Sequence, residues 1–122
     1  MLNQITIMGR LTRDPESRTT QSGEDVTSFS VACERDYAPQ SANRETDFID
    51  IVAWRKTAEF VQRYFRKGDM IAVSGRLQIR EWTDKAGNKR RNAEVVADHV
   101  YFGGSKQKQE FSELPDNVEV PF

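Results

Sequence analysis

The sequence predicts a mainly β domain that contains one helix. Apolar and polar residues alternate over five stretches, as in half-buried strands, and only one stretch repeats apolar residues at three- and four-residue spacing. Breaks rich in glycine, proline, asparagine and aspartate separate these stretches. The chain has 122 residues, 37% of them hydrophobic and 30% charged, which suits one globular domain with a polar segment attached.

The first strand is expected over residues 3–11. Its inward side carries Ile5, Ile7 and Leu11, because side chains alternate between the two faces of a strand. Gly9 shares that side, where a glycine permits a bend or the close approach of another backbone.

A second strand is expected over residues 26–34, after a break at 13–16 and a turn at 21–24. Cys33, the only cysteine, shares the side of Phe29. A single cysteine forms no intramolecular disulfide, so we expect an inert thiol buried in the core.

The third strand is expected over residues 46–54, after a loop at 37–45. Its inward side is expected to carry Ile49, Ile51 and Ala53. Its outward side is expected to carry Phe48, Asp50, Val52 and Trp54.

A helix is expected over residues 56–66, where apolar residues recur at three- and four-residue spacing. An amphipathic stripe is expected to contain Ala58, Val61, Tyr64 and Phe65. The Lys-Gly-Asp sequence that comes next is suited to ending the helix, since glycine adopts the left-handed conformation readily.

The fourth strand, expected over residues 70–82, is long enough to curve strongly, with a kink at Gly75. Its inward side is expected to carry Ile71, Val73, Leu77 and Ile79. Its outward side is expected to carry Ser74, Arg76, Gln78, Arg80 and Trp82. A charged hairpin tip at 84–89 leads into a last strand over 91–102.

Three strands, a helix and two more strands form the element order of the five-stranded Greek-key barrel called the OB-fold, in which the helix lies between strands three and four. The open face and loops of this fold bind oligonucleotides and oligosaccharides. A half-barrel or a ferredoxin-like sheet is the alternative, disfavoured because only one convincing helix is present. The domain is expected over residues 1–103, and residues 104–122 are expected to form a flexible tail with an acidic tip.

The outward sides of the third and fourth strands place large aromatic rings beside arginines. Phe48, Trp54 and Trp82 are the rings, and bases of single-stranded nucleic acid are the commonest partners for exposed rings beside guanidinium groups. The alternative is that they fill a core or a subunit interface. Phosphate contacts are expected from Arg10, Arg55, Lys56, Arg76, Arg80, Lys85, Lys89, Arg90 and Arg91.

The net charge of −1 does not exclude nucleic-acid binding. Residues 1–103 hold 16 basic and 15 acidic side chains, whereas residues 104–122 hold two lysines and four acids. A nearly neutral domain can still bind phosphates when its charges are sorted by face, and the alternation along the strands predicts such sorting.

Taken in order, several motifs resemble those of the bacterial and phage single-stranded DNA-binding proteins. They are MGRLTRDPE at 8–16, FSVA at 29–32, DFIDIVAW at 47–54, YFRKGD at 64–69 and VSGRL at 73–77, running on to WTD at 82–84. The chain also ends in Pro121-Phe122 after an acidic stretch, as members of this family do. The similarity covers about residues 1–103 and the last few residues.

The resemblance implies a homotetramer around which single-stranded DNA wraps, with base stacking on Tyr37, Phe48, Trp54 and Trp82. It implies replication, recombination and repair as the setting, and a nucleoid-associated protein. It also implies that Asp116, Glu119, Pro121 and Phe122 recruit partner proteins or compete with DNA for the basic face. Two departures bear on this tip: it holds two acids where relatives have a run of aspartates, and its linker is shorter.

No enzymatic activity and no cofactor are expected. His99 and Cys33 are the only residues of their types, too few for a zinc cluster of the usual spacing, and no phosphate-binding or nucleophile motif is present. No apolar run suggests a membrane span, so we expect a cytoplasmic protein. The alternatives are an OB-fold accessory protein that mainly contacts other proteins and, more distantly, a nucleic-acid-processing enzyme.

Overall fold

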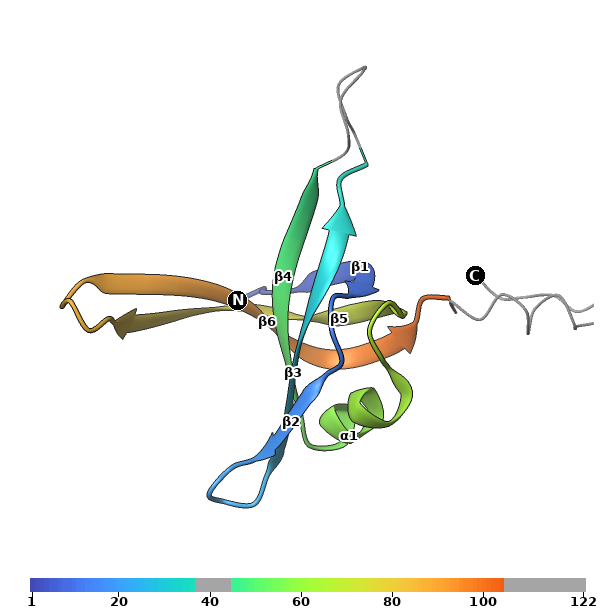
Figure 1. Cartoon of the computed structure of the whole chain (residues 1–122), viewed down its shortest axis with the longest axis horizontal. Coiled ribbons are helices and arrows are strands. Elements are labelled where there is room, and N and C mark those ends of the chain that lie inside the picture. Colours follow the sequence, from blue (N-terminus) through green and yellow to red (C-terminus); the bar gives the residue numbers. More distant parts are fainter. Residues whose placement is uncertain (37–44, 105–122) are drawn as a thin grey trace, which may run out of the picture.

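The computed structural model describes residues 1–36 and 45–104. Within them lie six strands and one helix (Figure 1). These are β1 (Ile5–Leu11), β2 (Glu16–Thr19), β3 (Asp25–Glu34), β4 (Thr46–Trp54), α1 (Arg55–Tyr64), β5 (Met70–Thr83) and β6 (Lys89–Phe102).

The strands form one sheet that closes on itself. Their order is β1-β5-β6-β4-β3-β2, and β1 also pairs with β3, so five strands complete a ring. The β4–β6 pairing is parallel and the others are antiparallel. This arrangement, with α1 between β4 and β5, is consistent with the OB-fold and confirms the predicted fold class.

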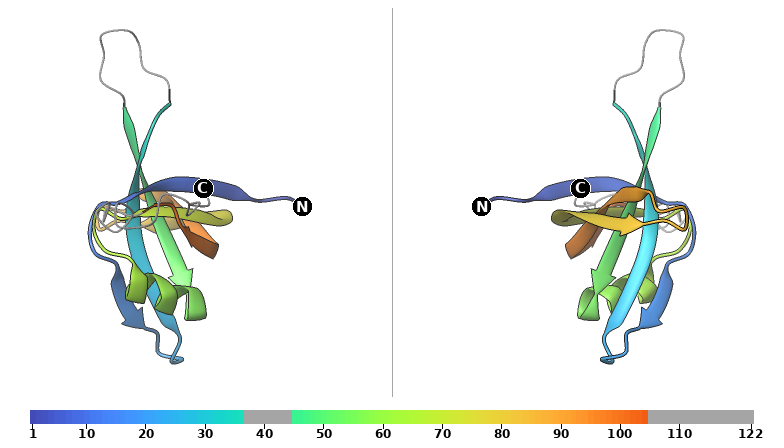
Figure 2. Two further views of the ribbon diagram at one scale, coloured as in Figure 1. Left: turned by 90° about the vertical axis from the view of Figure 1, so that its right-hand side faces the viewer. Right: turned by 90° about the vertical axis from the view of Figure 1, so that its left-hand side faces the viewer.

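The sheet is extended beyond the ring by two ribbons. In Figure 1 the β5–β6 hairpin reaches out to one side, while β3 and β4 run across it as a second ribbon. Helix α1 and β2 lie at the same end of the molecule, as both views in Figure 2 show. No helix among residues 1–36 and 45–104 is long and apolar enough to cross a membrane.

Strand β2 was not predicted. Its four residues are polar and exposed, so no apolar alternation marks them. It pairs only with β3, from Glu16 opposite Ser28 to Thr19 opposite Asp25. Backbone hydrogen bonds to a neighbouring strand hold this segment, and such pairing leaves no signal in the hydrophobic pattern.

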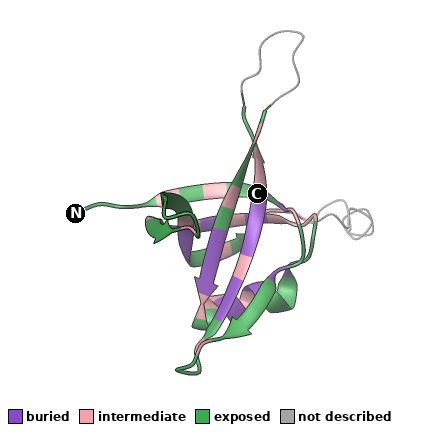
Figure 3. Cartoon of the chain, turned by 60° about the vertical axis from the view of Figure 1, so that its left-hand side comes forward, coloured by how far each residue is buried: buried purple, intermediate pink, exposed green. Residues whose placement is uncertain are grey.

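The core lies inside the ring, where α1 packs against it (Figure 3). The strand residues predicted to face inward largely do so, and Ile51, Ala53, Ile71 and Val73 are buried. Ile5, Ile7 and Ile49 are partly buried against the same cluster. The other main members of the core are Leu11, Phe29, Val31, Ala58, Val61, Phe65, Val95 and Ala97.

Three residues predicted to be buried are instead exposed. Leu77 and Ile79 keep the side of Val73, but they are 40% and 53% exposed in the described part of the chain, because the hairpin continues past the ring. Tyr64 is 51% exposed, since the buried stripe of α1 runs through Ala58 and Val61 to Phe65.

Cys33, which we expected to be buried in the core, is only half-buried at its edge, where its thiol donates to the carbonyl of Met8 over 3.3 Å. Burial, followed by the nearby Asp47 carboxylate, raises the pKa of this thiol. The thiolate is therefore disfavoured, as expected for an inert cysteine.

Two glycines permit close backbone contacts. A Cβ atom on Gly75 would lie 2.0 Å from the carbonyl oxygen of Val96, and one on Gly9 would lie 2.6 Å from that of Ala32. The pairing of β5 with β6 shifts register between Ser74 and Gly75. The predicted irregularity at Gly75 is thus present, and both positions exclude larger residues.

Candidate nucleic-acid interface

One side of the sheet formed by β4, β6 and β5 gathers the predicted aromatic and basic residues. Val52 on β4 pairs with Val96 on β6, and Val96 pairs with Arg76 on β5. Because side chains alternate, residues two positions apart along each strand share this surface. We call it the outer face, and define it by Phe48, Trp54, Arg76, Gln78, Arg80, Trp82 and Glu94.

Trp54 forms the apolar centre of the outer face. It is half-buried and packs against Val26, Val52 and Val96, a cluster separate from the main core. Val52 points outward as predicted but is buried within this cluster. The packing holds the indole in place on the sheet and leaves part of it accessible.

The other two predicted rings are more exposed. Phe48 lies opposite Ala32 of β3 and is 71% exposed, and Trp82 lies opposite Arg90 of β6 and is 47% exposed. Trp82 is near the tip of the β5–β6 hairpin, whereas Phe48 is near the start of β4. The rings are therefore distributed along the face. Tyr37, the fourth predicted stacking residue, lies outside the described residues.

Polar side chains connect the two predicted arginines of this face. Arg76 donates to Gln78 (3.1 Å), and the amide of Gln78 donates to Glu94 (3.4 Å). Arg80 forms an ion pair with the same carboxylate, with its Nε 2.8 Å from Oε1 of Glu94. Glu94, which we did not predict as a site residue, therefore holds Arg80 and partly compensates its charge.

The hairpin tip is ordered around Asp84. Its carboxylate accepts hydrogen bonds from the backbone amides of Ala86 and Asn88 and from the guanidinium of Arg90, at 2.8–3.0 Å. The Asn88 amide, and after it Arg90, lowers the pKa of this carboxyl. Lys85 and Lys89 are exposed at the tip.

Arg91 faces the reverse side of the hairpin. It is opposite Glu81 and forms an ion pair with it, with Nη2 3.1 Å from Oε1. This pair shares the side of Leu77 and Ile79, away from Trp82. The basic residues predicted around the hairpin thus divide between its two sides.

The remaining predicted basic residues lie at other places. Arg55 has a φ of +55° at the sharp turn from β4 into α1, where its guanidinium is 2.7 Å from Glu24. Lys56 is exposed in the first turn of α1. Both follow Trp54 directly. Arg10 is on the outward side of β1, where it donates to the carbonyl of Gly68 (3.0 Å).

An ion-pair cluster joins the ends of β3 and β4. Arg35 donates twice to Asp47, over 3.0 and 3.1 Å, and also pairs with Glu45. The hydrogen bonds to Arg35 lower the pKa of Asp47, and those same bonds raise the pKa of Arg35. The acidic charges of Glu45 and Asp47 are therefore partly neutralised.

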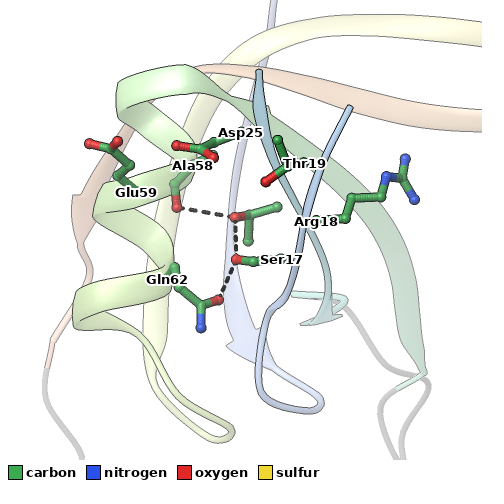
Figure 4. A pocket seen from close by; sticks show the side chains of 8 residues that line it. Ser17, Arg18, Thr19, Asp25, Ala58, Glu59 and Gln62 are labelled. Carbon is green, nitrogen blue, oxygen red and sulfur yellow. Dashed lines mark hydrogen bonds between the residues drawn. The ribbon is translucent and has the colours of Figure 1, made fainter. Parts of the chain in front are cut away.

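A hollow between β2, β3 and α1 is polar, but its groups contact one another (Figure 4). The hydroxyl of Ser17 donates to Gln62 (2.7 Å) and lies 2.9 Å from that of Thr27. Thr27 donates to the carbonyl of Ala58 (3.1 Å). These contacts attach β2 and β3 to the helix, which explains the hollow without a ligand.

The tip residues Asp116, Glu119, Pro121 and Phe122 lie outside the described residues, as does the predicted tail from residue 105 onward.

Comparisons with known proteins agree with the resemblance seen in the motifs. The chain matches the model of the single-strand binding protein family over residues 2–103. It is 42% identical over 129 residues to a protein named single-stranded DNA-binding protein from Caldanaerobacter subterraneus subsp. tengcongensis, an alignment that covers 100% of this chain and 86% of that protein.

Relatives from other bacteria carry the same name. The chain is 48% identical over 102 residues to single-stranded DNA-binding protein 1 of Staphylococcus aureus, which covers 84% of this chain and 65% of the relative. The match to the protein of Oceanobacillus iheyensis is 44% identical over 109 residues, covering 89% of this chain and 68% of that protein. This chain belongs to the single-strand binding protein family.

Proposed function

We propose that this protein binds single-stranded DNA without sequence preference, through the outer face. The observation that carries the proposal is the arrangement of Phe48, Trp54 and Trp82 beside Arg76 and Arg80 on neighbouring strands. Each base that stacks on an aromatic ring contributes about 1–3 kcal/mol, whatever the base. The names and identities of the relatives support single-stranded DNA as the ligand.

The basic residues divide into roles under this proposal. Arg76 and Arg80 contact phosphates between the stacked bases, and Lys85 and Lys89 follow the strand along the hairpin. Arg55 and Lys56 extend the path beyond Trp54. Tyr37 adds a further stacking position, and Arg10 and Arg90 complete the basic set, whereas Arg91, on the reverse side of the hairpin, lies off this path.

The biological role that we propose is protection of exposed single strands during replication, recombination and repair. Bound strands are kept unpaired and shielded from nucleases in the nucleoid. Partner proteins are recruited through the tip, where Asp116 and Glu119 supply negative charge and Pro121 and Phe122 supply apolar contact. The binding itself involves no catalytic step.

We further propose that the protein acts as a homotetramer. Residues Ile5–Gly9 of β1 pair with β5 on one side and are unpaired on the other among the described residues, because the pairing with β3 begins at Arg10. Such an edge can accept a strand from a second copy. Native mass spectrometry tests this proposal, and a monomer at micromolar concentration contradicts it.

Tryptophan fluorescence during titration with oligo-dT tests the DNA proposal directly. The chain has two tryptophans, and both lie on the outer face. Trp54→Phe leaves Trp82 as the reporter, and Trp82→Phe leaves Trp54. Both variants are expected to show quenching at near-stoichiometric DNA, because both indoles stack on bases.

A double variant, Trp54→Ala with Trp82→Ala, is expected to bind oligo-dT more weakly by several kcal/mol at most while remaining folded. Its affinity is measured by competition with a labelled oligonucleotide. Tyr64→Ala, which removes an exposed ring on α1, is the matched control and is expected to bind normally. Preference for duplex DNA, or wild-type affinity in the double variant, argues against the proposal.

A further inference from the structure

A cluster of aromatic rings lies at the junction of α1 and the end of β6. The ring of Phe60 is 4.9 Å from that of Tyr64 and 5.5 Å from that of Phe102, measured between centroids. Phe65 is buried beneath them and stacks on Phe102 at 5.0 Å. We call Phe60, Tyr64 and Phe102 the aromatic patch.

The aromatic patch is open to solvent. Tyr64 is 51% exposed and Phe102 is 58% exposed, although the two rings contact each other and Phe60. Adjacent exposed rings are unusual on a monomeric domain and mark an interaction site more often than scattered apolar residues do. This patch has no part in the binding of DNA proposed above.

Cations border the aromatic patch. A hollow of about 380 Å³ beside Phe60 and Tyr64 is lined by Lys56 and Arg63, with Glu59 as the one acid. Lys56 and Arg63 form no ion pair with any described residue. A segment that combines apolar side chains with carboxylates matches this surface.

The position of the patch separates it from the hairpin. Helix α1 and the C-terminal end of β6 lie on one side of the ring, and the hairpin tip extends on the other (Figure 1). The described chain ends at Gly104, two residues after Phe102. The chain therefore leaves the domain beside the patch.

The sequence that follows has the required chemistry. Residues 110–114 read Glu-Phe-Ser-Glu-Leu, and no basic residue occurs from 110 to 122. The nine residues from Phe102 to Phe111 span at most about 30 Å when extended. This reach exceeds the separation of the rings in the patch several-fold, so the segment can return to it.

We propose that residues 110–114 dock on the aromatic patch of their own chain. Phe111 and Leu114 contact the exposed rings, and Glu110 and Glu113 lie near Lys56 and Arg63. Docking places the tip residues beside α1, at a site distinct from the outer face. The proposal does not depend on DNA binding, and its test contains no DNA.

Cleavage of the full chain after Glu110 by a glutamate-specific protease, followed by mass spectrometry, tests the docking. In Tyr64→Ala the sequence around the cleavage site is unchanged, so any change in rate reflects the patch. The expected result is cleavage about five-fold faster than in wild type, as for the loss of one aromatic pair. Equal rates in the two proteins overturn the proposal.

Two further variants exclude indirect effects. Phe102→Ala is expected to accelerate cleavage, whereas Ile79→Ala, which removes an exposed apolar side chain of the distant β5–β6 hairpin, is expected to leave the rate unchanged. Arg63→Glu is expected to accelerate cleavage at Glu110, and adding Glu113→Lys to restore protection. Failure of this charge exchange, or protection that disappears on dilution and so involves another copy, contradicts docking within the chain.

Discussion

Replacing Glu94 with glutamine tests whether Arg80 contacts phosphate. In the free protein the Arg80 guanidinium lies 2.8 Å from the Glu94 carboxylate, and the side chains are 53% and 18% exposed. Glutamine keeps the size of the side chain and can still bond to Gln78, but it removes the charge that competes with phosphate. Loss of a partly exposed ion pair costs at most about 1 kcal/mol of stability.

The effect on DNA binding follows from the number of phosphates neutralised. If Arg80 gains one full phosphate contact, the slope of log affinity against log salt becomes steeper by about 0.7. Affinity for oligo-dT rises at low salt. Fluorescence titrations at four or more salt concentrations measure both quantities, and thermal unfolding measures the cost in stability.

Glu81→Gln is the matched control for Glu94→Gln. It releases Arg91 from an ion pair of similar length, 3.1 Å, on the reverse side of the same hairpin. If DNA follows the outer face, this variant leaves the slope unchanged. An unchanged or shallower slope in Glu94→Gln refutes the reasoning, since it means that Glu94 positions Arg80 productively or that Arg80 contacts no phosphate.

Three further predictions concern stability. Gly75→Ala places a Cβ 2.0 Å from the carbonyl oxygen of Val96 and is expected to disrupt the β5–β6 pairing. Gly87→Ala, at φ +85° with open space around it, is expected to cost only about 1 kcal/mol of stability. Thermal unfolding of both variants checks this difference. Phe65→Ala removes a buried ring and is expected to cost about 3–5 kcal/mol in urea unfolding, and a smaller loss contradicts its place in the core. The lowered pKa of Asp84 implies that its contribution to hairpin stability is complete above its ordinary pKa and is lost as pH falls through the lowered value. NMR chemical shifts of the hairpin amides, followed as pH is lowered, check this prediction. If the same pH-dependent change persists in Asp84→Asn, another group causes it and the prediction is wrong.

Much of the fold could be predicted because alternation is a local signal. Ile51, Val73 and Phe29 were assigned to the inward side from spacing alone, and each is buried. Strand β2 could not be found in this way, because its residues are held by backbone pairing and by Ser17 rather than by burial. Leu77 and Ile79 have the predicted side, but the pattern does not show where the ring ends and the hairpin begins.

For the candidate site, the sequence likewise predicted which side of a strand a residue occupies, but not its partners on neighbouring strands. The outward side of Trp54, Arg80 and Trp82 follows from a period of two, which each strand sets for itself. Glu94 was missed because an acid on an outward position of a strand has no distinguishing pattern. Only its place opposite Gln78 and beside Arg80 gives it a role.

The sequence by itself determined the side that most residues of the predicted strands occupy, since that depends on neighbours in the chain. The tertiary structure alone decided which strands lie side by side. Closure of the ring places β6 beside β4, so that Val96 packs with Trp54, while the register of the β5–β6 hairpin brings Glu94 to Arg80. It also brings Phe102 onto α1. The contacts of Val96 with Trp54 and of Phe102 with Phe60 join residues 42 positions apart. The register of all these contacts comes from backbone pairing and core packing, which no local period records.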